Sequence, residues 1–129
     1  MLIRHGRRCL LYFFSAFFIV FGLAGLFAPV ILLNALHLRP VTSAGLGELR
    51  SLYGGGFAGI GLVILAGLRC PAGRGLLLAM SIIMAGVVLG RLLSLLLDHD
   101  FSFAASNALF EFIIAVLCYY ESRQGLEPH

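Results

Sequence analysis

The sequence predicts an all-α membrane protein, a bundle of four transmembrane helices formed by residues 1–129 as a single domain. Hydrophobic residues make up 60% of the chain and charged residues only 12%, whereas a soluble domain is about 45–50% apolar and about 25% charged. The mean hydropathy is correspondingly high, at +1.02. Four apolar stretches each have the roughly 17–25 residues that a span requires: residues 9–28, 44–68, 75–97 and 103–120.

The first stretch, residues 9–28, is apolar and rich in phenylalanine, so we expect it to face lipid. The basic residues before it resemble the start of a signal peptide, and Gly22-Leu23-Ala24 is a weak cleavage pattern. We favour an uncleaved helix, because the apolar run continues to Ala28 and cleavage would leave only three spans.

The segment between the first two spans is too short and too polar to cross a membrane. Apolar residues around Ile31 and Leu32 predict one side of a short interfacial helix that Pro40 ends. We interpret His37 as an interfacial histidine in contact with water, in preference to a ligand or a proton carrier.

Small residues recur at every fourth position of the second span, and we call this set the Gly55 stripe: Gly47, Ser51, Gly55 and Gly59. Small side chains at this spacing allow the backbone of a neighbouring helix to approach closely. We therefore expect the stripe to pack against a helix of this chain or of another. A phosphate-binding role for the glycine run at 54–56 is disfavoured, because no strand precedes it.

The last two spans carry polar residues at helical spacing. Arg91, Ser94 and Asp98 share one face of the third span, and Asn107 and Glu111 share one face of the fourth. Tyrosines at positions 119 and 120 fit the aromatic belt found at membrane interfaces.

The basic residues predict the orientation of the chain. All nine are arginine, and most lie before the first span, in the 69–74 connection and after the last span. The positive-inside rule then places both termini and this connection in the cytoplasm. The basic residues do not cluster as they do in nucleic-acid-binding proteins, so no nucleic-acid partner is expected.

Ionisable groups at membrane depth are costly and are kept where they are paired or functional. From a helical rise of about 1.5 Å per residue, Arg50 and Arg91 lie roughly 9 Å, and Glu111 roughly 12 Å, from the periplasmic ends of their spans. We expect both arginines to contact acidic residues, with Glu111 as the central acceptor. The predicted polar cluster comprises Glu48, Arg50, Tyr53, Arg91, Ser94, Asp98, Asn107 and Glu111.

Two interpretations of the polar cluster stay open. It is either an ion-pair network that fixes helix packing or a binding site for a small anion, a lipid head group or a proton, since arginine favours carboxylate and phosphate partners. No arrangement typical of an enzyme is present. The three cysteines lack the spacing of a metal site, so we predict no metal and no cofactor.

Three motifs resemble those of a family of small bacterial four-helix inner-membrane proteins classed as a domain of unknown function. The segment from Gly47 to Gly55 fits its E-x-R-x-x-Y-G-G pattern, the segment from Gly90 to Asp98 fits G-R-x-x-S-x-x-x-D, and Glu111 follows in the last helix. The resemblance implies a bacterial inner-membrane location and, more distantly, the layout of DoxX-like membrane proteins.

We expect a non-enzymatic accessory or scaffold protein of the bilayer that associates with itself or with a larger membrane complex. The alternative is a binder or carrier of a small anion or lipid head group at the polar cluster. A further alternative, a membrane subunit of a quinone-linked oxidoreductase, is implied only by the DoxX-like layout.

Overall fold

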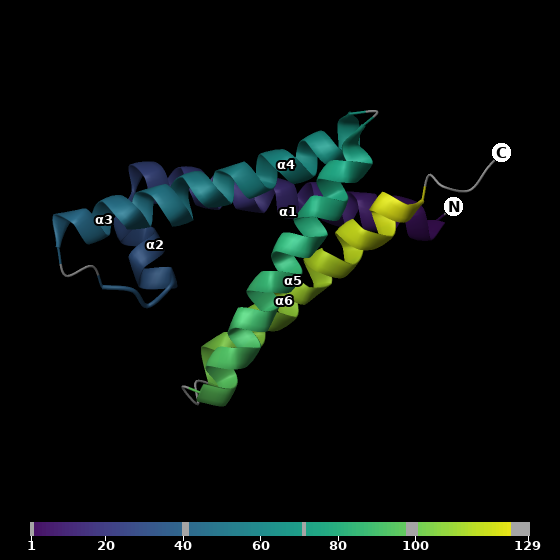
Figure 1. The fold of residues 1–129 in the computed structure, drawn as a ribbon. Coiled ribbons are helices and arrows are strands. Elements are labelled where there is room, and N and C mark those ends of the chain that lie inside the picture. The colour runs from purple at the N-terminus through teal and green to yellow at the C-terminus, as the bar shows by residue number, and fades with distance from the viewer. Residues whose placement is uncertain (1, 40–41, 71, 98–100, 125–129) are drawn as a thin grey trace. The chain divides into compact units, whose positions relative to one another are not determined.

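A computed structural model describes residues 2–39, 42–70, 72–97 and 101–124 of the chain, and every regular element among these residues is helical (Figure 1). The elements in order are α1 (Leu2–Phe27), α2 (Pro29–Ala35), α3 (Ser43–Leu49), the π-helical segment η1 (Arg50–Gly56), α4 (Phe57–Arg69), α5 (Gly73–Leu97) and α6 (Phe101–Arg123). The all-α prediction is therefore confirmed for the described residues.

The chain divides into two compact units. Unit 1 comprises Met1–Leu11 and Ala66–His129, and unit 2 comprises Tyr12–Leu65. Helices α1 and α4 each run from one unit into the other. That the whole chain forms a single domain stays a prediction.

In unit 1, α5 and α6 form a hairpin in which the two helices lie side by side (Figure 1). Leu77, Met80 and Met84 recur on one face of α5 and are all buried. The facing side of α6 presents small side chains, which allow close packing: Ala108, Ala115, Cys118 and Ser122. The Ser81 hydroxyl donates a hydrogen bond of 2.8 Å to the carbonyl oxygen of Ala115, so a polar contact also joins the two helices.

In unit 2, one face of α1 packs on η1 and α4. The Ser15 hydroxyl donates a buried hydrogen bond of 2.7 Å to the carbonyl oxygen of Gly61. The backbones are so close that a Cβ atom on Gly61 would lie 2.6 Å from the Ser15 carbonyl oxygen. The prediction that the first span faces lipid is wrong for this side of α1, where Phe14 and Phe18 are buried, although Phe13 is exposed.

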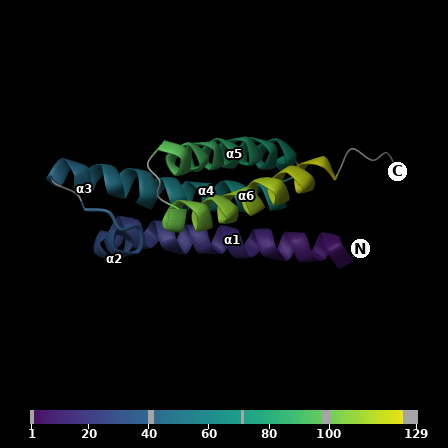
Figure 2. The same ribbon diagram turned by 90° about the horizontal axis from the view of Figure 1, so that it is seen from below.

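The second predicted span is one helical rod made of α3, η1 and α4, as Figures 1 and 2 both show. The Thr42 hydroxyl caps its start by accepting a hydrogen bond from the Gly45 amide. The rod widens into a π-helix at η1, whose last three residues are glycines with low α-helix propensity. The predicted short helix before Pro40 is also found, as α2, and it ends before His37, whose φ is 53°.

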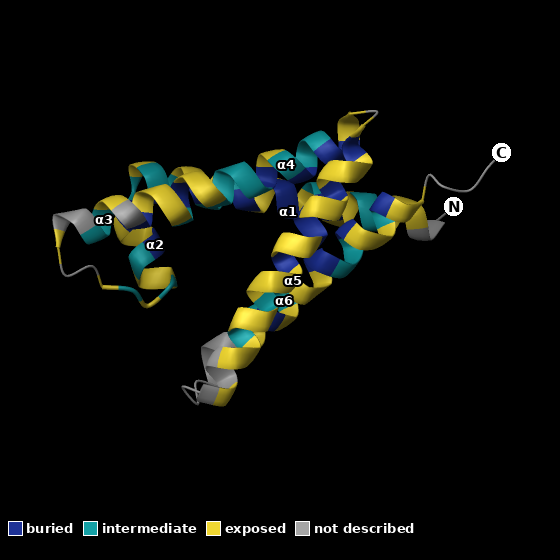
Figure 3. Ribbon diagram, in the orientation of Figure 1, coloured by how far each residue is buried: buried dark blue, intermediate teal, exposed yellow. Residues whose placement is uncertain are grey.

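Three helices of the described chain are long and apolar enough to cross a membrane, and they cover Arg4–Phe27, Gly45–Arg69 and Gly73–Leu93. Their ranges overlap the first three predicted spans. Helix α6 has 23 residues but carries Asn107, Glu111 and Glu121, which lower its apolar character. Much of the described ribbon is coloured as exposed (Figure 3). The exposed residues include large apolar ones, such as Val20, Ile82 and Leu96, as on proteins that meet lipid.

Candidate functional site

Two residues of the predicted polar cluster meet in unit 1, between α5 and α6. Arg91 Nη2 lies 3.0 Å from Glu111 Oε1, and Arg91 Nε donates to Glu111 Oε2 at 3.1 Å. The guanidinium therefore engages both carboxylate oxygens, which is the stronger, bidentate form of this pair. The Glu111 side chain is 13% exposed and the Arg91 side chain 31% exposed.

Helical spacing explains why this pair forms. Glu111 lies three residues after Ala108 and four before Ala115, so it shares the face of α6 that packs on α5. Arg91 follows Met84 by seven residues and therefore lies on the face of α5 that meets α6. Each charge thus lies at the helix contact, where its partner replaces the water that it loses.

That the remaining members of the predicted cluster join this pair stays a prediction. Arg50 is exposed in η1, and the half-buried Tyr53 contacts Phe57 edge to face at 5.6 Å; all three belong to unit 2. Asn107 is half-buried on α6, one turn before Glu111. The side chains of Glu48 and Ser94, and all of Asp98, lie outside the described residues. That Arg50 contacts an acidic residue stays a prediction.

The Gly55 stripe is not the helix-packing face of unit 2. No atom of the described residues lies within 4 Å of a Cβ atom built on Gly47, Gly55 or Gly59, and Ser51 is exposed. Unit 2 packs instead through the neighbouring face that contains Gly54 and Gly61. A Cβ atom on Gly54 would lie 2.9 Å from the Leu26 backbone nitrogen, so this face is the one that needs glycine. The stripe is therefore open among the described residues of unit 2, and its packing against a helix of this chain or of another stays a prediction.

A second group of charges in unit 1 was not anticipated from the sequence. Glu121, near the end of α6, has a side chain only 8% exposed. Its carboxylate oxygens lie 3.7 Å from Arg8 Nε and 3.9 Å from Arg7 Nη2, both on the first turns of α1. Arg8 also donates a hydrogen bond of 2.7 Å to the carbonyl oxygen of Leu68 at the end of α4. The sequence signal that could have found this group is the carboxylate that follows Tyr119 and Tyr120.

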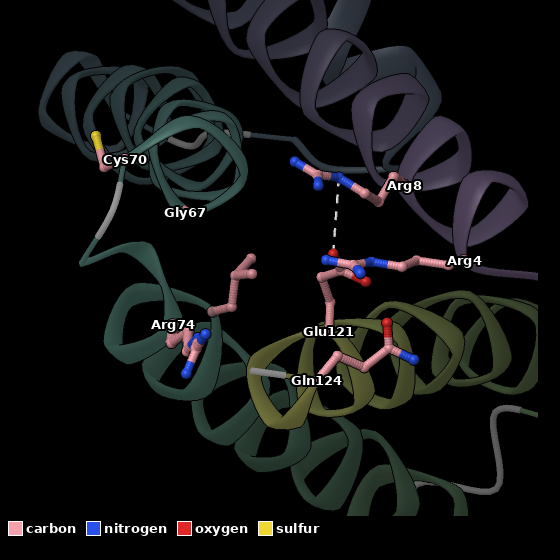
Figure 4. Close-up of a pocket in the computed structure, with 8 residues that line it drawn as sticks. Arg4, Arg8, Gly67, Cys70, Arg74, Glu121 and Gln124 are labelled. Atoms are coloured by element: carbon pink, nitrogen blue, oxygen red, sulfur yellow. Dashed lines mark ion pairs between the residues drawn. The ribbon is translucent and has the colours of Figure 1, made fainter. Parts of the chain in front are cut away.

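A cavity of about 130 Å³ adjoins this group (Figure 4). Arg4 and Arg8 extend toward it from α1, Arg74 comes from the start of α5, and Glu121 and Gln124 come from the end of α6. Gly67 forms part of the wall next to the turn between α4 and α5, where its backbone touches Gly73. The cavity is therefore polar and mainly basic.

An apolar groove of about 810 Å³ runs along the α5–α6 hairpin. Its walls are Val88, Leu89 and Leu92 on α5 and Phe112 and Val116 on α6, with tyrosines at one end.

The three cysteines are free, and only Cys118 is buried. Within the described residues no group of three histidine, cysteine or acidic side chains is placed to hold a metal ion.

These features define the class: a helical protein with membrane-spanning candidate helices, in which charged side chains pair between helices. The chain belongs to the family described as Domain of unknown function (DUF4345), and the match covers residues 7–121. It therefore includes Arg91, Glu111 and Glu121, whereas Arg4 precedes it. Neither the curated proteins nor the solved structures gave a match.

Proposed function

We propose that this protein is a non-enzymatic accessory or scaffold protein of the bacterial inner membrane, with four spans and both termini in the cytoplasm. The spans are α1, the α3–η1–α4 rod, α5 and α6, assembled as a bundle in a DoxX-like layout. The placement of the arginines supports the orientation, since they concentrate at both termini and in the connection from Arg69 to Arg74.

The proposal that α6 is the fourth span is supported by its contact with α5. A helix packed along a spanning helix shares its depth, and the Ser81–Ala115 and Arg91–Glu111 contacts join the two helices at two separate points along the hairpin. The Glu111 charge, which makes α6 less apolar, is neutralised by Arg91 at that depth. An even number of spans also fits termini on one side.

The observation that carries the accessory role is the bidentate Arg91–Glu111 pair. One guanidinium engages both oxygens of this carboxylate, which suits a contact that holds two helices together better than proton transfer. The pair therefore supports the interpretation of the predicted cluster as a structural network.

The Gly55 stripe supports the scaffold role. It presents small residues along the proposed second span, and none of the described residues of unit 2 covers it. We propose that it docks against a helix of a second copy of this chain, because close backbone approach is what drives helices together in lipid.

The test compares two glycines that have open space around them in this chain. Gly55→Leu and Gly86→Leu both place a large side chain where nothing lies within 4 Å, but only Gly55 belongs to the stripe. Native mass spectrometry in mild detergent should show an oligomer for the wild type and Gly86→Leu, and monomer for Gly55→Leu. An oligomeric state that Gly55→Leu leaves unchanged would refute docking through the stripe.

A further inference from the structure

The basic cavity of unit 1 carries more positive than negative charge. Three arginines line it, namely Arg4, Arg8 and Arg74, and Glu121 is the one carboxylate among its lining residues. The lining therefore has a formal excess of two positive charges. Arg7, which contacts Glu121 but does not line the cavity, adds a third. A partly enclosed excess of this kind attracts an anion, because burial weakens screening by water and salt.

The Glu121 carboxylate makes only long contacts with Arg7 and Arg8. The distances of 3.7 Å to Arg8 and 3.9 Å to Arg7 are ion-pair contacts but are longer than hydrogen bonds. Arg7 Nε, Arg7 Nη2 and Glu121 Oε2 are buried, and none has a hydrogen-bond partner in the described part of the chain. Arg7 does not line the cavity, but its unpaired buried donors show that Glu121 leaves part of the positive charge around it uncompensated.

The size and the donors of the site suit a tetrahedral oxyanion. A cavity of about 130 Å³ has room for several water molecules or one such ion. Guanidinium groups bind two oxygens of a phosphate at once, and the Gln124 amide adds another possible donor. The lining side chains come from helix ends at the start of α1, the start of α5 and the end of α6, where the termini of membrane helices meet the head-group region.

We propose that this cavity binds a phosphate group, either that of an anionic phospholipid head group or free inorganic phosphate. Arg4, Arg8 and Arg74 hold the phosphate oxygens, and Glu121 limits the affinity by occupying part of the positive field. This site is distinct from the Arg91–Glu111 pair, which lies between the middle of α6 and the far part of α5.

Two arms of one experiment distinguish free inorganic phosphate from a phospholipid head group as the source of the bound phosphate. In the first, inorganic phosphate is titrated into the full-length protein in neutral detergent at constant ionic strength, and the thermal unfolding midpoint gives the apparent affinity. In the second, in a buffer without inorganic phosphate, nanodiscs of zwitterionic phosphatidylcholine are compared with nanodiscs that also contain anionic phosphatidylglycerol. Stabilisation in the first arm identifies free phosphate, and stabilisation in the second arm alone identifies the lipid head group.

Three variants test the residues. Arg4→Gln removes one lining guanidinium and should weaken binding by about tenfold or more. Arg123→Gln is the matched control. It also removes one arginine charge, at the end of α6 that contributes Glu121 and Gln124 to the cavity, but the Arg123 side chain interacts with Tyr119 and does not line the cavity. It should change the affinity by less than about twofold.

Glu121→Gln keeps the proposal testable if an arginine variant fails to fold. It should be less stable than the wild type without anion, because it leaves Arg7 and Arg8 without their counter-charge. It should bind the anion about tenfold more tightly. No stabilisation in either arm, an equal loss in Arg4→Gln and Arg123→Gln, or weaker binding in Glu121→Gln would each overturn the site.

Discussion

Breaking the Arg91–Glu111 pair from one side should destabilise the protein more than replacing both partners. Glu111→Gln leaves the Arg91 guanidinium at the α5–α6 contact without its counter-charge, whereas Glu111→Gln combined with Arg91→Met leaves no charge to solvate. Removing one partner of a fully buried pair costs about 3–5 kcal/mol, and an exposed pair is worth about 0–1 kcal/mol.

The structure places this pair between those limits. With side chains 13% and 31% exposed, and with three hydrogen-bond contacts between them, we expect Glu111→Gln to cost about 2 kcal/mol after discounting for solvent. The double variant should cost about 1 kcal/mol, since a neutral pair of similar size loses the ionic contact but also its desolvation penalty.

The assay is reversible unfolding by sodium dodecyl sulfate in mixed micelles, with the free energy of unfolding measured for the wild type, each single variant and the double. Glu111→Gln combined with Arg123→Met is the control cycle. The Arg123 guanidinium lies over the Tyr119 ring, at 5.4 Å, so the two changes should add. If the Arg91–Glu111 cycle is also additive, the pair does not couple and the structural role proposed for it is wrong.

Two further predictions follow from the topology and from the packing of unit 2. Alkaline phosphatase fused after Arg39 should be active and the same enzyme fused after Gln124 inactive, because the proposed orientation exports only the first of these positions; activity at Gln124 would reverse the orientation. Gly61→Ala should lower the thermal unfolding midpoint, since its Cβ atom would lie 2.6 Å from the Ser15 carbonyl oxygen, whereas Gly86→Ala fills open space and should hold or raise it by improving helix propensity. Equal midpoints for these two variants would contradict the close approach of α1 to α4.

The sequence by itself determined the helical class, the apolar stretches and the facing positions of Arg91 and Glu111. These features depend on local properties: hydropathy over about 20 residues, a periodicity of 3.6 residues and a rise of about 1.5 Å per residue. Two groups at similar depth on adjacent spans can therefore be matched without coordinates. The observed helices extend beyond the predicted spans where polar or basic residues continue a helix past its apolar part, as at the start of α1 and at the end of α6.

Only the tertiary structure decided which small-residue face of the second span packs on α1. The Gly55 stripe and the face of Gly54 and Gly61 are neighbouring faces of the same helical rod, and both consist of small residues. Residue spacing alone therefore does not predict which of the two faces packs on α1. The choice depends on where Ser15 and Leu26 of α1 meet the rod. The basic cavity is non-local in the same way, because Arg8 and Glu121 are more than a hundred residues apart and only the meeting of helix ends brings their charges together.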